Sequence, residues 1–469
     1  MLWFRNDLRI TDNPALAAAS VHDELLPVYI YDRENAGDWP AGGASRWWLH
    51  HSLDALASAL KKRGSRLVIR RGPAKRILPE LVRESGAGHV YWNRRYEPAE
   101  VASDTGIKQA LGEGGVDVTT FNAGLLFEPW QVRRADGGPY KVFSAFWKTC
   151  LRSGLSSDVT PAPERLPRAP GLKGLAIDEL GLLPEIRWDT GLGKSWQPGE
   201  AGALERVDGF LADAAAAYAG ARDRPDLPGT SRLSPHLHFG EIGPRQVLSA
   251  IAARRADLDD AGRGIESFVR ELGWREFAFH LLFRFPQTAT EPLNPRFAGF
   301  PWRTDYVEDL RRWQRGLTGI PLVDAGMREL WHTGWMHNRV RMVAASFLTK
   351  NLLIPWQEGA RWFWDTLVDA DLASNTLGWQ WVAGSGADAA PYFRVFNPVL
   401  QGEKFDPTGA YVRRWIPELE ALESPLVHKP WSAPPDQQAA LEDAGYPPPM
   451  IDLRTSRERA LAAYRGLSG

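Results

Sequence analysis

Residues 334–397 form the most informative stretch of the chain. It begins GWMHNRVRM, continues with DADLASNTLGWQW and closes with APYFRVFN. Asn338 and Met342 are four residues apart, so a helix would place them on one face. Two carboxylates, Asp369 and Asp371, are followed closely by two tryptophans. A plain helical core needs no such mixture, so the stretch predicts a pocket for a flat, redox-active ligand with a polar edge.

Composition narrows the range of functions. The chain has 469 residues, a formal net charge of -1 and 21 tryptophans. This length predicts about two or three domains, and the charge restricts any nucleic-acid site to a local basic patch. The single cysteine, Cys150, excludes an intramolecular disulfide and a multi-cysteine metal site. No apolar run has membrane-spanning length and the start, MLWFRND, lacks a signal-peptide pattern, so we expect a cytoplasmic protein without a membrane partner.

The first 128 residues predict an α/β domain with a Rossmann-like parallel sheet. Short apolar runs such as LLPVYIYD, SRLVIRRG and GHVYWN alternate with amphipathic stretches, which is the βαβ pattern. Asn13 before Pro14 predicts a helix start for PALAAAS. No GxGxxG follows the first strand, so a dinucleotide fold of that type is not supported. Glu100 follows the fourth apolar run as a candidate ligand contact, and the alternative is a solvated acid at a helix start.

The remainder divides into a linker and a helical domain. Residues 129–200 predict a long connection that wraps between domains, because prolines and glycines interrupt its second half. Residues 201–469 have helical periodicity throughout and no strand alternation, which predicts an all-α catalytic domain.

The segment GTSRLSPHLHFGEI predicts a loop that leads into a helix. Small hydroxyls and free backbone N–H groups at such a junction suit a phosphate, and the alternative is a simple capping cluster. The residues concerned are Thr230, Ser231, Arg232, Leu233 and Ser234.

The segment ESFVRELGWREF predicts a helix with a functional face. Glu271 and Trp274 are three residues apart and share that face. An acid beside a tryptophan can act as a hydrogen-bond partner for a carbonyl, whereas the alternative is an ordinary ion pair with Arg270 or Arg275.

Asp369, Asp371 and Asn375 are predicted to lie together in a polar loop, DADLASN, whose role is open to two interpretations. Asp369 and Asp371 suit either a metal ion or hydrogen bonds to a heterocycle, and the spacing does not decide between them. Arg341 is a candidate partner for Asp369 inside the protein. A further set of cations is predicted to bind phosphate, or else to be ordinary surface charge; it consists of Arg339, Arg394 and Lys404.

Seven motifs together resemble the photolyase/cryptochrome family over essentially the whole chain. They are WFRNDLRITDNPAL, TSRLS, ELGWREF, TGWMHNRVRM, DADLASNTLGWQW, APYFR and FNPVLQGEKFD. The chain resembles most the microbial cyclobutane pyrimidine dimer photolyases of class I or class III. The resemblance implies a deoxyribodipyrimidine photo-lyase with non-covalent, reduced FAD, which repairs a flipped-out pyrimidine dimer in damaged DNA with light. It also implies a monomer without a metal ion.

The resemblance assigns residues to the flavin and to the lesion. Asn375 matches the position that faces flavin N5, and a neutral amide there favours the photolyase type of flavin chemistry. The other predicted flavin contacts are Tyr218, Thr230, Ser231, Arg232, Leu233, Ser234, Arg275, Arg341, Asp369 and Asp371. Glu271 and Asn338 match the residues that bind the carbonyls of the dimer. The walls that pack on the flipped bases are predicted to be Trp274, Met342 and Trp381.

The resemblance also implies an electron-transfer chain and an antenna. Trp379, Trp356 and Trp302 match the tryptophans that reduce the flavin stepwise, with Trp313 as the alternative third member. An antenna of methenyltetrahydrofolate or deazaflavin is expected, with a flavin or no antenna left open. The usual Asn–Glu pair of folate-binding members is Ala99 and Glu100 in this sequence.

Three alternative functions are weighed against this one. A cryptochrome-type photoreceptor that signals through a protein partner is disfavoured by Glu271, Asn338 and Met342 and by the short C-terminal segment. A (6-4) photolyase is disfavoured because histidines replace Asn338 and Met342 in that group. A flavoprotein without photochemistry is disfavoured by the predicted tryptophan chain.

Overall fold

The structure is a computed structural model that describes residues 1–35, 37–254, 262–388 and 393–467. The chain forms two compact units that are each assembled from separate segments. Unit 1 contains Met1–Ala216, Ser231–Pro286 and Val368–Ala373. Unit 2 contains Ala217–Thr230, Gln287–Leu367 and Ser374–Gly469.

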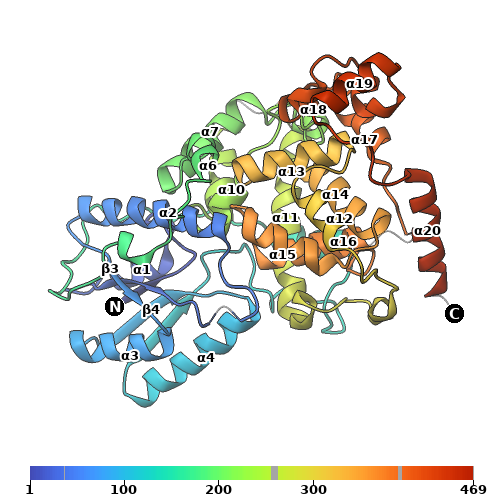
Figure 1. The fold of residues 1–469 in the computed structure, drawn as a ribbon. Coiled ribbons are helices and arrows are strands. Elements are labelled where there is room, and N and C mark those ends of the chain that lie inside the picture. The colour runs from blue at the N-terminus through green and yellow to red at the C-terminus, as the bar shows by residue number, and fades with distance from the viewer. Residues whose placement is uncertain (36, 255–261, 389–392, 468–469) are drawn as a thin grey trace. The chain divides into compact units, whose positions relative to one another are not determined.

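Unit 1 contains a five-stranded parallel sheet with the strand order β3-β2-β1-β4-β5 (Figure 1). The central strand β1 pairs with β2 and β4, so that Trp3 lies opposite Val28 on one side and Trp92 on the other. Because all pairs are parallel, every connection must cross over the sheet, and helices make these crossovers. The strands are β1 (Leu2–Phe4), β2 (Pro27–Tyr31), β3 (Val68–Arg71), β4 (His89–Asn93) and β5 (Asp117–Phe121).

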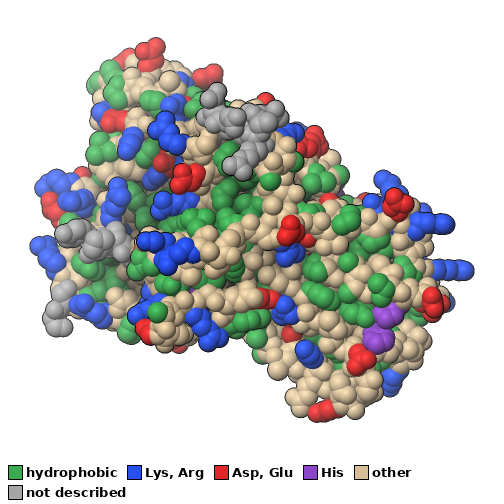
Figure 2. Space-filling view, turned by 180° about the vertical axis from the view of Figure 1, so that it is seen from behind, with side chains coloured by type: hydrophobic (Ala, Val, Ile, Leu, Met, Phe, Trp, Pro, Cys, Tyr) green, Lys and Arg blue, Asp and Glu red, His purple; other side chains and the backbone are tan. Residues whose placement is uncertain are grey.

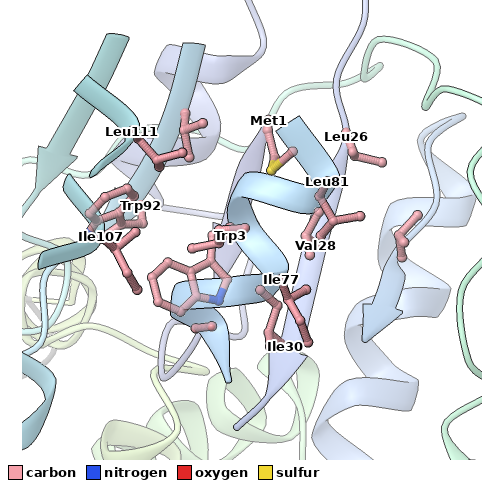
Figure 3. Packing of buried hydrophobic residues seen from close by; sticks show 14 residues of the cluster. Met1, Trp3, Leu26, Val28, Ile30, Ile77, Leu81, Trp92, Ile107 and Leu111 are labelled. Carbon is pink, nitrogen blue, oxygen red and sulfur yellow. The ribbon is translucent and has the colours of Figure 1, made fainter. Parts of the chain in front are cut away.

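Helices cover both faces of this sheet, which confirms the predicted Rossmann-like architecture. Helix α2 (Gly43–Lys62) lies on one face, and α3 (Ala74–Ser85) and α4 (Pro98–Glu113) lie on the other (Figure 1). Apolar side chains of α3 and α4 fill the core beneath the sheet, where Ile77 and Ile107 pack with Trp3 and Trp92 (Figure 3). Burial of this apolar layer stabilises the sheet and the helices on this face.

The short helix α1 (Pro14–Ala19) begins where the sequence predicts. The Asn13 side chain accepts a hydrogen bond of 3.0 Å from the Leu16 N–H, and Pro14 occupies the first helical position. This combination satisfies one free N–H and fixes the first φ angle. Helix α1 packs on β1, β4 and β5.

The remaining helices of unit 1 carry much of the predicted site. Helix α5 (Phe143–Ser153) lies inside the segment predicted to be a linker, because aromatic side chains bury one of its faces. Beyond residue 158 that segment contains only the short η1 (Asp178–Leu180) and α6 (Thr190–Ser195). The others are α7 (Glu200–Asp213), α9 (Ser234–His238), α10 (Pro244–Ala253) and α11 (Gly262–Arg284).

The regular secondary structure in the described residues of unit 2 is entirely helical, as the sequence predicts. Helix α14 begins at Asn338, so Asn338, Arg339 and Met342 share one helix as expected. The principal helices are α8 (Tyr218–Ala221), α12 (Val307–Gln314), α13 (Pro321–Thr333), α14 (Asn338–Ser346), α15 (Trp356–Thr366), α17 (Pro398–Phe405), α18 (Ala410–Trp415), α19 (Pro435–Asp443) and α20 (Leu453–Gly466).

One local prediction is wrong. Asn375 was expected in a polar loop with Asp369 and Asp371, but it lies in the first turns of α16 (Leu372–Ala383). The helix begins directly after Asp371, since LASNTLGWQW contains neither proline nor a turn signal after its first residue. None of the helices in the described residues is both long and apolar enough to span a membrane.

Candidate flavin and lesion site

Four residues of the predicted phosphate loop, Ser231–Ser234, lie at the start of α9 in unit 1, and Thr230 ends a segment of unit 2. Arg232 has a φ of +52°, and the Leu233 N–H donates to the Ser231 Oγ over 3.4 Å. Below the loop, His236 shares a 2.5 Å hydrogen bond with the buried Glu241, which also accepts from the Trp48 Nε1–H. This buried network fixes the loop from the protein side. Hydroxyls and amides of a fixed loop at a helix start are a suitable donor set for a pyrophosphate.

Two acids precede α16 in the same unit. Asp369 and Asp371 are buried, with 8% and 7% of their surface exposed. The Nδ1 of His238 lies 3.6 Å from the Oδ2 of Asp371, and both side chains are nearly buried. The sequence analysis missed His238, although it lies only four residues after Ser234, the last residue of the predicted phosphate loop. The acids fit a ligand that donates hydrogen bonds, as the ring and ribose of a flavin do.

The lesion face of α11 is held by a stacked aromatic pair. Trp274 is half-buried and stacks on Phe143 of α5, with ring centroids 3.8 Å apart and planes at 8°. The Arg270 guanidinium lies over Phe143, 5.3 Å from the centre of that ring. Offset and stacked aromatic pairs of this kind restrict ring motion. Phe143 therefore supports the predicted wall, and its segment gave no sequence signal for that role.

Arg275 and Glu276 point to the other side of α11. Arg275 donates to the Gly124 carbonyl over 2.6 Å and to the Leu237 carbonyl over 3.4 Å. The Oε2 of Glu276 accepts from the N–H groups of Leu126 and Phe127. Burial raises the pKa of Glu276 to about 7, with Arg275 acting in the opposite direction. Glu276 thus anchors the segment after β5. The role of Arg275 as a flavin contact stays a prediction.

Helix α14 in unit 2 presents the predicted lesion contacts at an accessible surface. Asn338 is exposed at the first helical position, and Met342 is half-buried one turn later. Trp381 is also half-buried, and its Nε1–H donates to the Asp388 carbonyl over 3.0 Å. Met342 and Trp381 each leave part of an apolar side chain accessible. Arg341 donates from Nε to the Met336 carbonyl over 2.7 Å, which ties the helix to the preceding turn.

The predicted phosphate-binding cations include a pair that shares one aromatic ring. Arg339 lies 4.4 Å and Lys404 4.9 Å from the ring centre of Phe405. Arg339 also forms an ion pair of 2.9 Å with Asp223. Cation–π contacts hold both cations over the ring, and the Asp223 carboxylate also engages Arg339. Arg394 is exposed over Phe396, and Figure 2 shows Lys and Arg side chains mixed with acidic ones on the face that it draws.

The other flavin candidates of unit 2 lie on α8 and α16. Tyr218 is 6% exposed at the start of α8, and Arg222 lies over its ring at 5.7 Å. The Asn375 amide nitrogen donates to the Ala360 carbonyl over 3.1 Å. This hydrogen bond orients the side-chain amide of Asn375, with its nitrogen toward Ala360.

Trp379 is packed tightly in unit 2. It is 2% exposed and contacts Phe363 and Trp313, with ring centroids 5.0 and 6.3 Å apart. A Cβ added at Gly359 would lie 2.0 Å from Trp379 Cη2, so only glycine fits there. Trp356 is also buried, at 2%.

The two candidates for the third tryptophan differ in exposure. Trp302 is half-buried and lies 4.3 Å from Phe300 in a small aromatic cluster. Trp313 is fully buried. A tryptophan at the surface end of an electron chain must be accessible, which favours Trp302.

Glu100 in unit 1 is not the solvated acid that the alternative interpretation proposed. Its carboxylate lies 3.6 Å from Arg95 and 3.8 Å from Arg5, and it accepts from the Asn35 side chain over 3.3 Å. Burial raises its pKa, while the two arginines act in the opposite direction. The cluster occupies the carboxyl ends of β1 and β4, where the strand order reverses. Its role toward an antenna stays a prediction.

Within the described residues, no three His, Cys, Asp or Glu side chains gather in a group suited to a metal ion. Asp369 and Asp371 therefore have no third protein ligand of these types in that part of the chain. Of the two interpretations left open by the spacing, hydrogen bonding to a heterocycle is the better supported.

Comparison with known proteins decides the family. Residues 1–168 match the family model described as DNA photolyase, and residues 268–466 match the FAD binding domain of DNA photolyase. The chain belongs to the photolyase/cryptochrome family. It is 50% identical to a deoxyribodipyrimidine photo-lyase of Agrobacterium fabrum, over 99% of this chain and 97% of that protein. It is 40% identical to cryptochrome-2 of Arabidopsis thaliana, over 98% of this chain and 77% of that protein.

Solved structures agree with this assignment. A bacterial class III photolyase from Agrobacterium tumefaciens matches with a TM-score of 0.94 and 48% identity, over 100% of this chain and 97% of that one. A photolyase from Sulfolobus tokodaii, solved with two FAD molecules, matches with a TM-score of 0.83 and 27% identity, over 99% of both chains. The predicted family, fold class, FAD cofactor and photo-lyase activity are thereby confirmed, whereas the individual site residues stay predictions.

Proposed function

We propose that this photolyase repairs cyclobutane pyrimidine dimers in DNA by light-driven electron transfer to a flipped-out dimer. The observation that carries the proposal is the set of accessible side chains on the two predicted lesion faces. Glu271 and Trp274 are half-buried on α11, and Asn338, Met342 and Trp381 are accessible on α14 and α16. Accessible apolar side chains together with polar groups suit a flipped-out pyrimidine dimer. Its bases need stacking contacts, and its edge needs hydrogen bonds.

The residues present fit FAD in both units. The Ser231–Ser234 loop would hold the pyrophosphate with Thr230, Tyr218 and Arg275, and the acids Asp369 and Asp371 would accept from the ring and ribose. When bound in its reduced state, FAD supplies an electron after it absorbs light. Asn375 would face N5 with an oriented, uncharged amide, because its nitrogen is engaged with Ala360.

Side chains of this protein would hold the dimer by hydrogen bonds and apolar contacts. Glu271 and Asn338 would hydrogen-bond the dimer carbonyls, so that charge arriving on the dimer is stabilised by groups already in place. Trp274, Met342 and Trp381 would pack against the bases. A dimer is already poorly stacked, so flipping it costs less than flipping a normal base, by about a few kcal/mol.

Affinity for the DNA backbone would come from the cations of unit 2. Arg339 and Lys404 share the Phe405 ring, and Arg394 is exposed. Contacts of this type carry no sequence information and weaken as salt rises. Cations that bind backbone phosphates set general DNA affinity and not the preference for damage.

Reduction of the flavin would proceed by stepwise transfer through tryptophans. Trp379 would be the first donor, Trp356 the second and the half-buried Trp302 the third. Several rings are required because each step must be short.

The organisation of the chain completes the proposal. Residues 1–128 would form the antenna domain, 129–200 the linker and 201–469 the FAD- and DNA-binding domain. The second chromophore would be methenyltetrahydrofolate or deazaflavin, with Glu100 among its contacts. The protein would act as a metal-free monomer in the cytoplasm.

Illumination of the fully reduced protein with a dimer-containing oligonucleotide tests this proposal. We expect repair in light and none in the dark, and a strong loss of repair for Glu271→Ala. Absence of repair by reduced, illuminated protein would favour the cryptochrome-type photoreceptor, to which the 40% identity with a plant cryptochrome lends weight.

A further inference from the structure

Helix α13 carries two buried acids that each accept a hydrogen bond from a buried tyrosine. The Tyr411 hydroxyl donates to Glu329 Oε2 over 2.6 Å, and the Tyr446 hydroxyl donates to Asp324 Oδ2 over 2.9 Å. All four residues are at most 3% exposed. The two contacts are therefore alike in chemistry, burial and supporting helix.

The two acids differ in what else they hold. Asp324 accepts from the N–H groups of Thr318 and Gly319, so it fixes the entry to its own helix. The Oε2 of Glu329 instead accepts from the His337 N–H over 3.4 Å. His337 is the residue that caps α14, because its Nδ1 accepts from the Arg339 N–H over 3.2 Å.

The turn between α13 and α14 is tied down at further points. The Thr333 hydroxyl donates to the Glu329 carbonyl over 2.8 Å and accepts from the Trp335 N–H over 3.2 Å. The Arg341 Nε donates to the Met336 carbonyl over 2.7 Å. Asn338 follows this turn directly and is exposed, so its direction is set by the backbone of the turn and not by packing around its side chain.

We propose that Glu329 and Tyr411 are positioning residues for the lesion: through His337 they fix the start of α14, and with it the orientation of Asn338 toward the dimer. This inference rests on the proposed role of Asn338. Neither residue touches DNA in this account, since both are buried. Recognition groups must be held within about 0.5 Å of the productive geometry, so a small shift of the α14 start reduces preference for damage.

Tyr411→Phe and Tyr446→Phe form a matched pair that tests the inference. Each removes one hydroxyl that donates to a buried acid on α13, so both should lower the melting temperature similarly. We expect Tyr411→Phe to reduce the ratio of affinities for dimer-containing over undamaged oligonucleotide by about fivefold, the size of one lost hydrogen bond. Tyr446→Phe should leave that ratio within about twofold of the native value. Equal ratios in the two variants would overturn the inference.

A second pair covers the acid itself. Glu329→Gln keeps an oxygen that accepts from both Tyr411 and His337, so it should retain the native affinity ratio, whereas Glu329→Leu should lose it. In steady-state repair, Tyr411→Phe and Glu329→Leu should raise KM for the dimer and leave kcat in saturating light unchanged, which a general loss of folding would not do. A native ratio in Glu329→Leu would contradict the proposed positioning.

Asn338→Ala distinguishes a failure of the positioning role from a failure of the proposed role of Asn338. If it lowers the affinity ratio while Tyr411→Phe does not, the positioning role is wrong and the role of Asn338 stands. If Asn338→Ala leaves the ratio unchanged, the assignment of Asn338 fails and the inference that rests on it fails as well.

Discussion

Gly359→Ala is the substitution that tests the packing of the proposed first electron donor. An added Cβ would lie 2.0 Å from Cη2 of Trp379, and 2.5 and 2.6 Å from Cζ3 and Cζ2. Ordinary van der Waals contact begins at about 3.4 Å, so the indole edge must move by roughly 1.4 Å or α15 must shift. Trp379 is 2% exposed and enclosed by Phe363 and Trp313, so there is little room for a movement of that size.

Overpacking of a filled core usually destabilises a protein by about 1–3 kcal/mol. We expect Gly359→Ala to lower the free energy of unfolding by that amount, and to slow photoreduction of oxidised flavin because the ring is displaced. Repair by chemically reduced protein should persist, since it does not use this path. Photoreduction is measured by the loss of oxidised-flavin absorbance under blue light with an external thiol.

Gly209→Ala provides the control for adding a methyl group in a helix. Gly209 lies in α7, and a Cβ there meets no atom of the described residues within 4 Å. This variant should gain about 0.5–1 kcal/mol of stability from the helix propensity of alanine and photoreduce normally. Native photoreduction and stability in Gly359→Ala would refute the packing that we describe around Trp379.

The remaining predictions concern electron flow, pH and salt. Trp379→Phe should block photoreduction while repair by chemically reduced protein continues; loss of both would contradict the proposed chain. Trp302→Phe should slow photoreduction under the same light, and an unchanged rate would remove it as the surface member. The pKa of Glu276 is about 7 in the folded state and about 4.5 when unfolded, so the folded state binds more protons and stability falls as pH rises from 4.5 to 7. Glu276→Gln should therefore be more stable than the native protein in urea unfolding at pH 8, with the difference vanishing near pH 4.5, and a pH-independent difference would contradict the burial argument. Lys404→Gln should weaken binding to damaged and undamaged DNA equally and reduce the salt slope by about 0.9, whereas a selective loss for damaged DNA would place Lys404 at the lesion.

Local patterns in the sequence predicted most of the fold. The apolar runs at Pro27–Tyr31 and His89–Asn93 are buried parallel strands, and Asn13 with Pro14 starts α1 as predicted. These features depend on neighbouring residues, so a single sequence contains the information for them. The loop prediction for Asn375 was wrong because the short segment ASN has no periodicity that distinguishes a loop from a helix start.

The supporting residues of the site could not be found in this way. Phe143 stacks on Trp274 across 131 positions of sequence, and His238 lies beside Asp371 across 133 positions. Tyr411 meets Glu329 across 82 positions. Contacts of this type arise from tertiary packing, and neither spacing nor residue type signals them. The resemblance to the family supplied the candidate ligand contacts but not the residues that hold them.

A light-dependent repair assay on two lesions, measured side by side, tests the central claim most directly. The fully reduced protein would be illuminated with an oligonucleotide that contains either a cyclobutane dimer or a (6-4) photoproduct, and restored thymines would be quantified. We predict repair of the cyclobutane dimer alone, because Asn338 and Met342 occupy the positions at which (6-4) photolyases carry histidines. Repair of the (6-4) photoproduct, or of neither lesion, would contradict the account.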